Sequence, residues 1–357
     1  MGLSAFNISF LAYHLFLCYE YNTMTKKGEV MKKFIVFVIL LGLIFAGYFI
    51  LTNNHNKETK QTHIKVGEVT HSVFYAPQYV ADALGYFKDE GLDVDIILTS
   101  GADKVTTSVL SGDVQIGFCG SEATMYLYNQ GEKDYLVNFA GLTKKDGSFI
   151  VSSKKIKNFS VKDLSGKKIL GGREGGMPAM TLEYALKQNG VTDADIDTSV
   201  DFSSMSGAFI GGNGDFVTLF EPTASEIQKE GYGYIVASVG ELGGNVPYTA
   251  YNAKKSYIKN NPTVIKGFTT AIQKGLDYVH SHSAKEIASV ISKHFPDNSI
   301  TELTDIVQKY IDIDAWYKTT YIEKKDFEHI MDIVSSAGKL EKKVPYKKLV
   351  NNTYSDQ

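Results

Sequence analysis

The stretch VTHSVFYAPQYVADALGYFKDEGLDVDIILTSGADKVTTSVLSGDVQIGFCGSEATMYLY, residues 69–128, decides the fold. Short β-rich runs alternate in it with helical patterns, and a glycine or acidic turn closes each unit. This spacing predicts a parallel sheet with helices on its faces, and such sheets bind ligands beyond the carboxyl ends of their strands. The pattern predicts strands over 63–69, 93–98 and 114–118, and helices over 78–88 and 106–110.

The chain then repeats this organisation. A second α/β series begins at 167–170, and Gly243, Gly244 and Asn245 interrupt it before 248–252 crosses back to the first unit. Two crossings, near 148–152 and 244–250, would let two lobes close on each other like hinged domains. We therefore expect lobe 1 over 63–150 plus 250–340, lobe 2 over 151–249 and a tail over 341–357.

The N-terminal region carries an export signal. Residues 34–51, FIVFVILLGLIFAGYFIL, form an uncharged run about long enough to cross a bilayer, and lysines precede it. No small-residue cleavage site follows. We expect 31–53 to be a signal or transmembrane segment, uncleaved, anchoring the protein on the outer face of the membrane with 54–62 as a tether. Cleavage, giving a secreted or periplasmic protein, is the alternative. Residues 1–30 are a doubtful leader, because MKKFIVF at Met31 looks like a start.

Composition narrows the class of protein. The 357 residues carry a net charge of −3, which gives no basic footprint for nucleic acid. The two cysteines, Cys18 and Cys119, predict neither a disulfide in the exported part nor a metal site. Cys119 ends a predicted strand and is expected to be a small buried side chain.

Several motifs together carry a family resemblance. Phe74, Tyr75 and Pro77 follow the first strand, and GYF, EGLDVDI and SGDVQIG come next, with DLSGKKI at 163–169 and FVTLFEP at 216–222. This ordered series resembles the substrate-binding proteins of ABC importers, in the group that binds aliphatic sulfonates, taurine, nitrate or thiamine-pyrimidine precursors.

The resemblance covers roughly residues 63–334 and has definite implications. It implies a two-lobed α/β fold of the periplasmic-binding-protein type II, with a ligand cleft between the lobes. The protein would capture a small solute by lobe closure and deliver it to ABC permease subunits in the membrane. It would be a monomer, with no catalytic residues and no cofactor.

Turns at the ends of strands supply the candidate ligand contacts. Helix starts offer unpaired N–H groups, glycines allow close approach, and aromatic rings can stack on a ligand. The expected ligand-binding residues are His71, Ser72, Phe74, Tyr75, Gly120, Ser121, Glu122, Arg173, Gly175, Gly176, Met177, Glu221 and Tyr248.

The charges among these candidates do not determine whether the ligand is an anion or an amine. Arg173, the only arginine, could grip a sulfonate, phosphate or carboxylate. Glu122 and Glu221 would instead suit amino or aminopyrimidine groups.

Two other functions are alternatives. A pyrimidine-synthase-like enzyme on the same fold would use His71, and a ligand-sensing ectodomain would need a signalling domain. We expect no enzymatic activity, because the export segment argues against cytosolic biosynthesis and no familiar catalytic motif is present.

Overall fold

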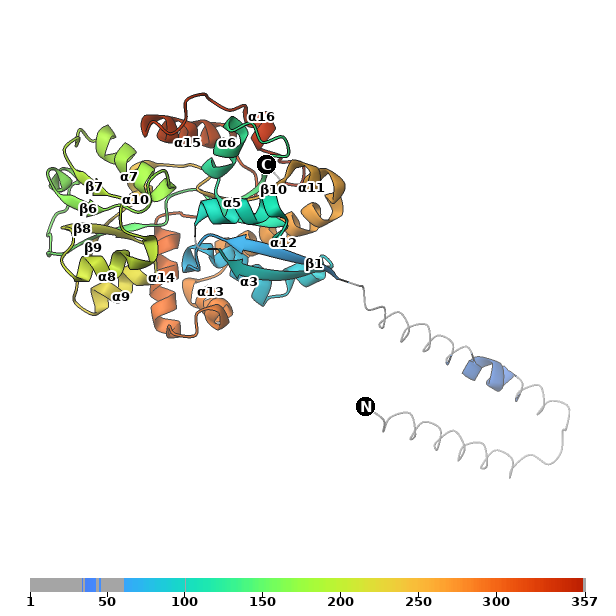
Figure 1. The fold of residues 1–357 in the computed structure, drawn as a ribbon. Coiled ribbons are helices and arrows are strands. Elements are labelled where there is room, and N and C mark those ends of the chain that lie inside the picture. The colour runs from blue at the N-terminus through green and yellow to red at the C-terminus, as the bar shows by residue number, and fades with distance from the viewer. Residues whose placement is uncertain (1–33, 35, 43–44, 46–60, 100, 356–357) are drawn as a thin grey trace. The chain divides into compact units, whose positions relative to one another are not determined.

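A computed structural model describes residues 34, 36–42, 45, 61–99 and 101–355. Within these residues the strands form two five-stranded sheets, one in each lobe (Figure 1). The predicted two-lobed α/β fold is confirmed. Sheet A has the order β2 (Leu92–Leu98), β1 (Thr62–Glu68), β3 (Ile116–Gly120), β10 (Thr249–Lys254), β4 (Leu136–Thr143). Sheet B has the order β7 (Asp195–Asp197), β6 (Lys168–Leu170), β8 (Phe216–Leu219), β5 (Phe149–Ser152), β9 (Tyr234–Ser238).

The two sheets are built by the same rule. In each, three neighbouring strands are parallel, and the strand that follows a crossing between lobes is inserted antiparallel: β10 between β3 and β4, and β5 between β8 and β9. β5 begins at Phe149 and β10 at Thr249, so the crossings lie just before these residues. The expected lobe boundary at 150/151 falls inside β5.

Helices surround both sheets. Lobe 1 uses α3 (Ala76–Ala83), α4 (Tyr86–Asp89), α5 (Ala102–Ser111), α6 (Glu122–Asn129), α11 (Lys255–Asn260), α12 (Pro262–Ser281), α13 (Ala284–Ile291) and α16 (Tyr346–Leu349). Lobe 2 uses α7 (Met177–Gln188), α8 (Met205–Ile210), α9 (Thr223–Lys229) and α10 (Val239–Gly243). Two more, α14 (Ile300–Asp312) and α15 (Lys324–Ser336), lie where the lobes meet (Figure 1).

Local differences from the predicted elements have physical reasons. The single helix predicted over 78–88 is two helices, because Gly85 adopts a left-handed conformation, φ 77°, between α3 and α4. The region expected to be a tail, 341–357, includes α16, and Val350 bridges to Asn138 at the edge of sheet A.

The expected membrane segment lies mostly outside the described residues. Phe34 and residues 36–42 are helical. In the part of the chain that is described, no helix is both long and apolar enough to span a bilayer. The expected leader at 1–30 and most of the tether at 54–62 also fall outside it.

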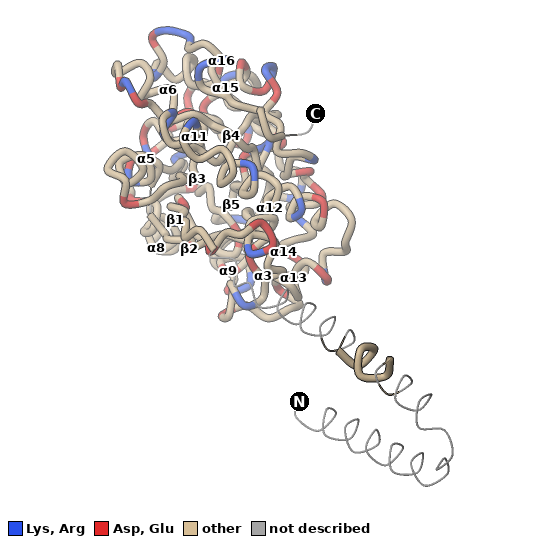
Figure 2. The backbone as a smooth tube through the Cα atoms, turned by 90° about the vertical axis from the view of Figure 1, so that its right-hand side faces the viewer, with Lys and Arg blue, Asp and Glu red and all other residues tan. Residues whose placement is uncertain are grey.

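Charged residues show no separation by sign. Figure 2 shows lysines interspersed with aspartates and glutamates along the same segments of the side that faces the viewer. Such a distribution creates no strong single-sign field over that side.

The contact between α12 and α3 gives a stability prediction. A Cβ at Gly275 would meet the backbone carbonyl of Pro77 at far less than van der Waals distance, so Gly275→Ala must push α12 from α3. We expect a loss of about 1–3 kcal/mol in the free energy of unfolding, measured with urea. Gly207→Ala in α8, where nothing lies within 4 Å, is the control and should gain up to about 1 kcal/mol. Equal stabilities of the two variants would contradict this packing.

Candidate functional site

Side chains from both lobes and both crossings meet at the interface between the lobes. Phe74 comes from the turn after β1, Glu122 begins α6, Phe220 follows β8, and Asp146 and Tyr248 lie on the two crossings. All five side chains are buried. We call these five residues the interlobe site.

An aromatic wall forms one part of this site. The ring centroid of Phe74 lies 5.7 Å from that of Phe220 in lobe 2 and 5.9 Å from that of Tyr248. The Phe74 carbonyl accepts a 2.8 Å hydrogen bond from the indole N–H of Trp316. Tyr75 stacks edge-on against Phe118, 4.4 Å between centroids. Flat rings at these separations offer a ligand an apolar, stacking surface.

Glu122 places a carboxyl group beside this wall. A Cβ at Gly120 would overlap the Glu122 carboxyl, so the side chain is folded back over the end of β3. Tyr126, one helical turn later on the same face of α6, donates a 3.1 Å hydrogen bond to the Gly175 carbonyl of lobe 2. That face of α6 is therefore the one that meets the other lobe.

Asp146 brings a second buried carboxyl group to the site. Its Oδ1 accepts hydrogen bonds from the backbone N–H and hydroxyl of Ser148, at 2.7 and 2.6 Å. Tyr248 lies close enough to lower the pKa of Asp146, yet its hydroxyl makes no hydrogen bond of ordinary geometry. Asp146 was not predicted as a site residue, because TKKDGS reads as an exposed turn.

Three unpartnered polar atoms belong to the interlobe site. Six buried side-chain polar atoms of the described residues have no hydrogen-bond partner; Glu122 Oε2, Asp146 Oδ2 and the Tyr248 hydroxyl lie in this site, and the other three belong to Asn138, Thr181 and Asn252. Buried polar atoms are nearly always paired, so unpaired ones at one interface indicate places for a ligand or water. Burial raises the pKa of Glu122 to about 8 and that of Asp146 to about 6.

Several other predicted residues hold the interface together through the backbone. The Ser72 hydroxyl donates to the Glu221 carbonyl at 2.7 Å, which ties the lobes directly. The Ser121 hydroxyl donates to the Pro247 carbonyl at 2.5 Å, and it does not cap α6. Gly176 is the N-cap of α7, and Met177 is buried at the start of that helix.

The structure takes three predicted side chains away from the interlobe site. Arg173 is exposed and pairs with Asp103 of lobe 1 at 2.8 Å. The Glu221 carboxylate accepts hydrogen bonds from the backbone N–H and the hydroxyl of Ser225, so it caps the start of α9. It also forms a 2.6 Å ion pair with Lys309. The third is His71.

His71 belongs to a separate network inside lobe 1. Its Nδ1 lies 2.9 Å from Glu68 Oε1 and its Nε2 lies 2.8 Å from the His294 carbonyl. Glu68 Oε2 accepts from the Tyr79 hydroxyl at 2.8 Å. Since both ring nitrogens face acceptors, the arrangement fits an imidazolium, and the hydrogen bond to Glu68 raises the pKa of His71 despite the opposing effect of burial.

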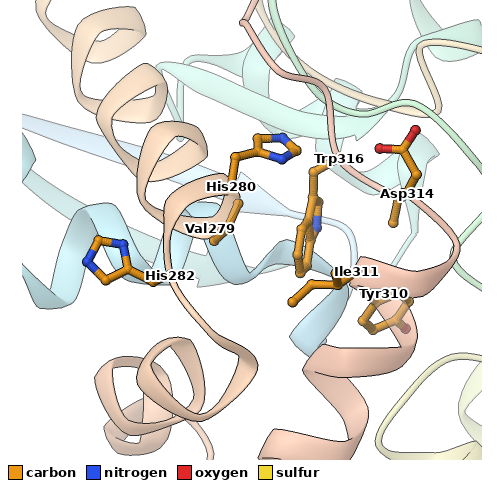
Figure 3. A pocket seen from close by; sticks show the side chains of 8 residues that line it. Val279, His280, His282, Tyr310, Ile311, Asp314 and Trp316 are labelled. Carbon is orange, nitrogen blue, oxygen red and sulfur yellow. The ribbon is translucent and has the colours of Figure 1, made fainter.

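A shallow hollow lies behind the aromatic wall. Its volume is about 130 Å³, and its lining includes His280, Tyr310 and Trp316. Figure 3 shows Trp316 in the middle of the group, with Ile311 and Tyr310 below it and His280 above. The Tyr310 ring is tilted against that of Phe74, with 5.2 Å between the centroids, and the Trp316 indole N–H donates to the Phe74 carbonyl. These two side chains therefore support the aromatic wall from behind.

Comparison with solved structures identifies the fold. The periplasmic aliphatic sulphonate binding protein SsuA from Escherichia coli superposes with a TM-score of 0.64 at 16% identity, over 81% of this chain and 97% of that chain. The chain thus has the two-sheet α/β fold of the solute-binding proteins of ABC importers.

Sequence comparison gives the family. Residues 73–286 match the family model described as NMT1/THI5 like. The Bacillus subtilis (strain 168) protein named "Putative binding protein YtlA" is 42% identical over 304 residues, 84% of this chain and 91% of that protein. The chain belongs to the NMT1/THI5-like family. The family resemblance seen in the sequence is confirmed.

A more distant relative is an enzyme. The 4-amino-5-hydroxymethyl-2-methylpyrimidine phosphate synthase of Candida albicans (strain WO-1) is 27% identical over 227 residues, 58% of this chain and 64% of that enzyme. The chain is therefore similar both to a protein named for binding and to one named for pyrimidine synthesis.

The His71 network gives a prediction about pH. Because its pKa is raised in the folded state, the His71–Glu68 pair stabilises the protein fully below the unfolded pKa of about 6.5 and loses this effect as pH rises through the folded pKa. His71→Gln should therefore lower the melting temperature more at pH 6 than at pH 9. His63→Gln, at an exposed pair with Asp93, is the control. A deficit that does not change with pH would argue against an imidazolium at His71.

Proposed function

We propose that this protein is the extracytoplasmic solute-binding component of an ABC importer and that it captures a small solute by closing its two lobes. The observation that carries the proposal is the interlobe site, where an aromatic wall and two buried carboxyl groups, each with one unpartnered oxygen, lie between lobes that touch. ABC permease subunits would be its partners. It would act as a monomer on the outer face of the membrane, anchored by residues 34–51 or released by cleavage.

The chemistry of the site favours one ligand class among the alternatives. A sulfonate or nitrate needs cationic or N–H donors, but Glu122 and Asp146 present carboxyl oxygens and Arg173 is paired outside the site. An aminopyrimidine supplies N–H donors for these oxygens and a flat ring for Phe74, Phe220 and Tyr248. We therefore propose an amino-substituted pyrimidine of the thiamine-precursor type as the solute.

A binding role accounts for the site better than an enzymatic one. The synthase alternative needs His71 to reach the ligand, but its two ring nitrogens lie at hydrogen-bonding distance from Glu68 and from the His294 carbonyl. None of the five residues of the interlobe site is a histidine that could replace His71 in this role.

A thermal-shift screen tests the proposal. The purified protein is heated with free and formylated aminopyrimidines, thiamine, taurine, alkanesulfonates or nitrate. We expect a saturable rise in melting temperature with an aminopyrimidine alone, because a ligand at 100 times its Kd stabilises the folded state by about 2.7 kcal/mol. A shift with a sulfonate or nitrate would overturn the ligand class, and no shift with any compound would favour the enzyme.

Arg173 gives a separate test of where the ligand binds. An exposed ion pair contributes about 0–1 kcal/mol, so Arg173→Ala and its matched control Asp103→Ala should both leave the ligand-induced shift nearly unchanged. Glu122→Ala should remove most of that shift. If Arg173→Ala alone abolished the shift, the ligand would be an anion held by the guanidinium group.

A further inference from the structure

The surroundings of Glu122 contain no compensating positive charge. Its exposed fraction is 2%, and the titratable groups that interact with it are Tyr75, Cys119, Tyr126 and Tyr248. None of these is a cation, and none of the ion pairs found in the described residues includes Glu122. The hydrogen bond from its own backbone N–H lowers the pKa of Glu122, but the loss of water on burial outweighs it, because an ionised carboxylate buried in this way loses several kcal/mol of hydration.

Asp146 is buried to the same degree but is better supported. Two hydrogen bonds from Ser148 reach its Oδ1, and Tyr248 faces it from the second crossing. The neighbouring Lys144 and Lys145 point to Asp314 and to the Ile313 carbonyl. Hydrogen bonds to the charged form favour that form, so Asp146 keeps its charge more readily than Glu122.

We propose that the interlobe site recognises a ring nitrogen beside an amino group through the protonated carboxyl of Glu122, so that each ligand captured takes up one proton from the solvent. This inference rests on the proposed function, because it concerns the same site and ligand class. A carboxylic acid offers one O–H donor and one carbonyl acceptor on the same edge. An aminopyrimidine offers the complementary acceptor and donor, so the two edges form paired hydrogen bonds.

Lobe closure is the step that takes up the proton. While the lobes are apart, Glu122 is in water and is ionised at pH 7, as an ordinary glutamate is. Closing them removes that water, and burial raises the pKa of Glu122 to about 8. The proton therefore binds with the ligand. By linkage, affinity falls as pH rises from about 5 to 8, at most about tenfold per pH unit.

Titration calorimetry tests the inference with 4-amino-5-hydroxymethyl-2-methylpyrimidine as the probe. Binding heats at pH 7 in phosphate, imidazole and Tris give the number of protons taken up, which should lie between about 0.5 and 1 per ligand. Glu122→Gln keeps one donor and one acceptor, so it should still bind while the uptake falls close to zero. Glu241→Gln, at an exposed position in α10, is the matched control and should keep the uptake.

Each outcome decides a definite point. Binding without proton uptake, or uptake unchanged in Glu122→Gln, overturns this inference and leaves the proposed function standing. If the probe does not bind, the proposed ligand class fails. The proton inference rests on that ligand class, so it is overturned with it.

Discussion

The structure depends on the way the chain crosses between its lobes. Each crossing delivers a strand that is inserted antiparallel into the sheet it enters, so neither lobe is complete without the other segment of the chain. Because β10 is held between β3 and β4, Tyr248 just before it has a fixed place. The same holds for Asp146 just before β5. The two crossings thus position a carboxyl group and a phenol exactly where the lobes meet.

Further ties reinforce this arrangement from the C-terminal helices. α14 reaches lobe 2 through the ion pair of Lys309 with Glu221, and it reaches the first crossing through a 3.1 Å hydrogen bond from the Tyr310 hydroxyl to the Gly147 carbonyl. α15 packs on α7, and His329 Nδ1 lies 2.8 Å from the Asn245 carbonyl. Opening the lobes must break exposed ion pairs, whose loss costs little free energy because water solvates the separated charges. It must also break buried hydrogen bonds such as the one from the Ser72 hydroxyl to the Glu221 carbonyl, whose loss costs more.

The sequence predicts the elements better than the directions of side chains. Alternating strand and helix patterns identify the α/β units, because apolar periodicity reports which face is buried. The same patterns placed His71 and Glu221 at the right turns. The His71 side chain nevertheless pairs with Glu68, and the Glu221 side chain pairs with Lys309. The sequence pattern does not reveal which partner a polar side chain will find. Asp146 was missed for the converse reason: its burial depends on Gly240 and on Tyr248 from the second crossing.

Charge placement supports the proposed aminopyrimidine over a simple anion as the ligand. Its only arginine lies on the surface, while two acidic side chains occupy the interior of the interface. Burying acids without cations destabilises the closed lobes unless a ligand supplies donors, because unpaired buried polar groups cost about 1–3 kcal/mol each. In the proposed mechanism, the property that weakens the empty closed form makes closure depend on the ligand.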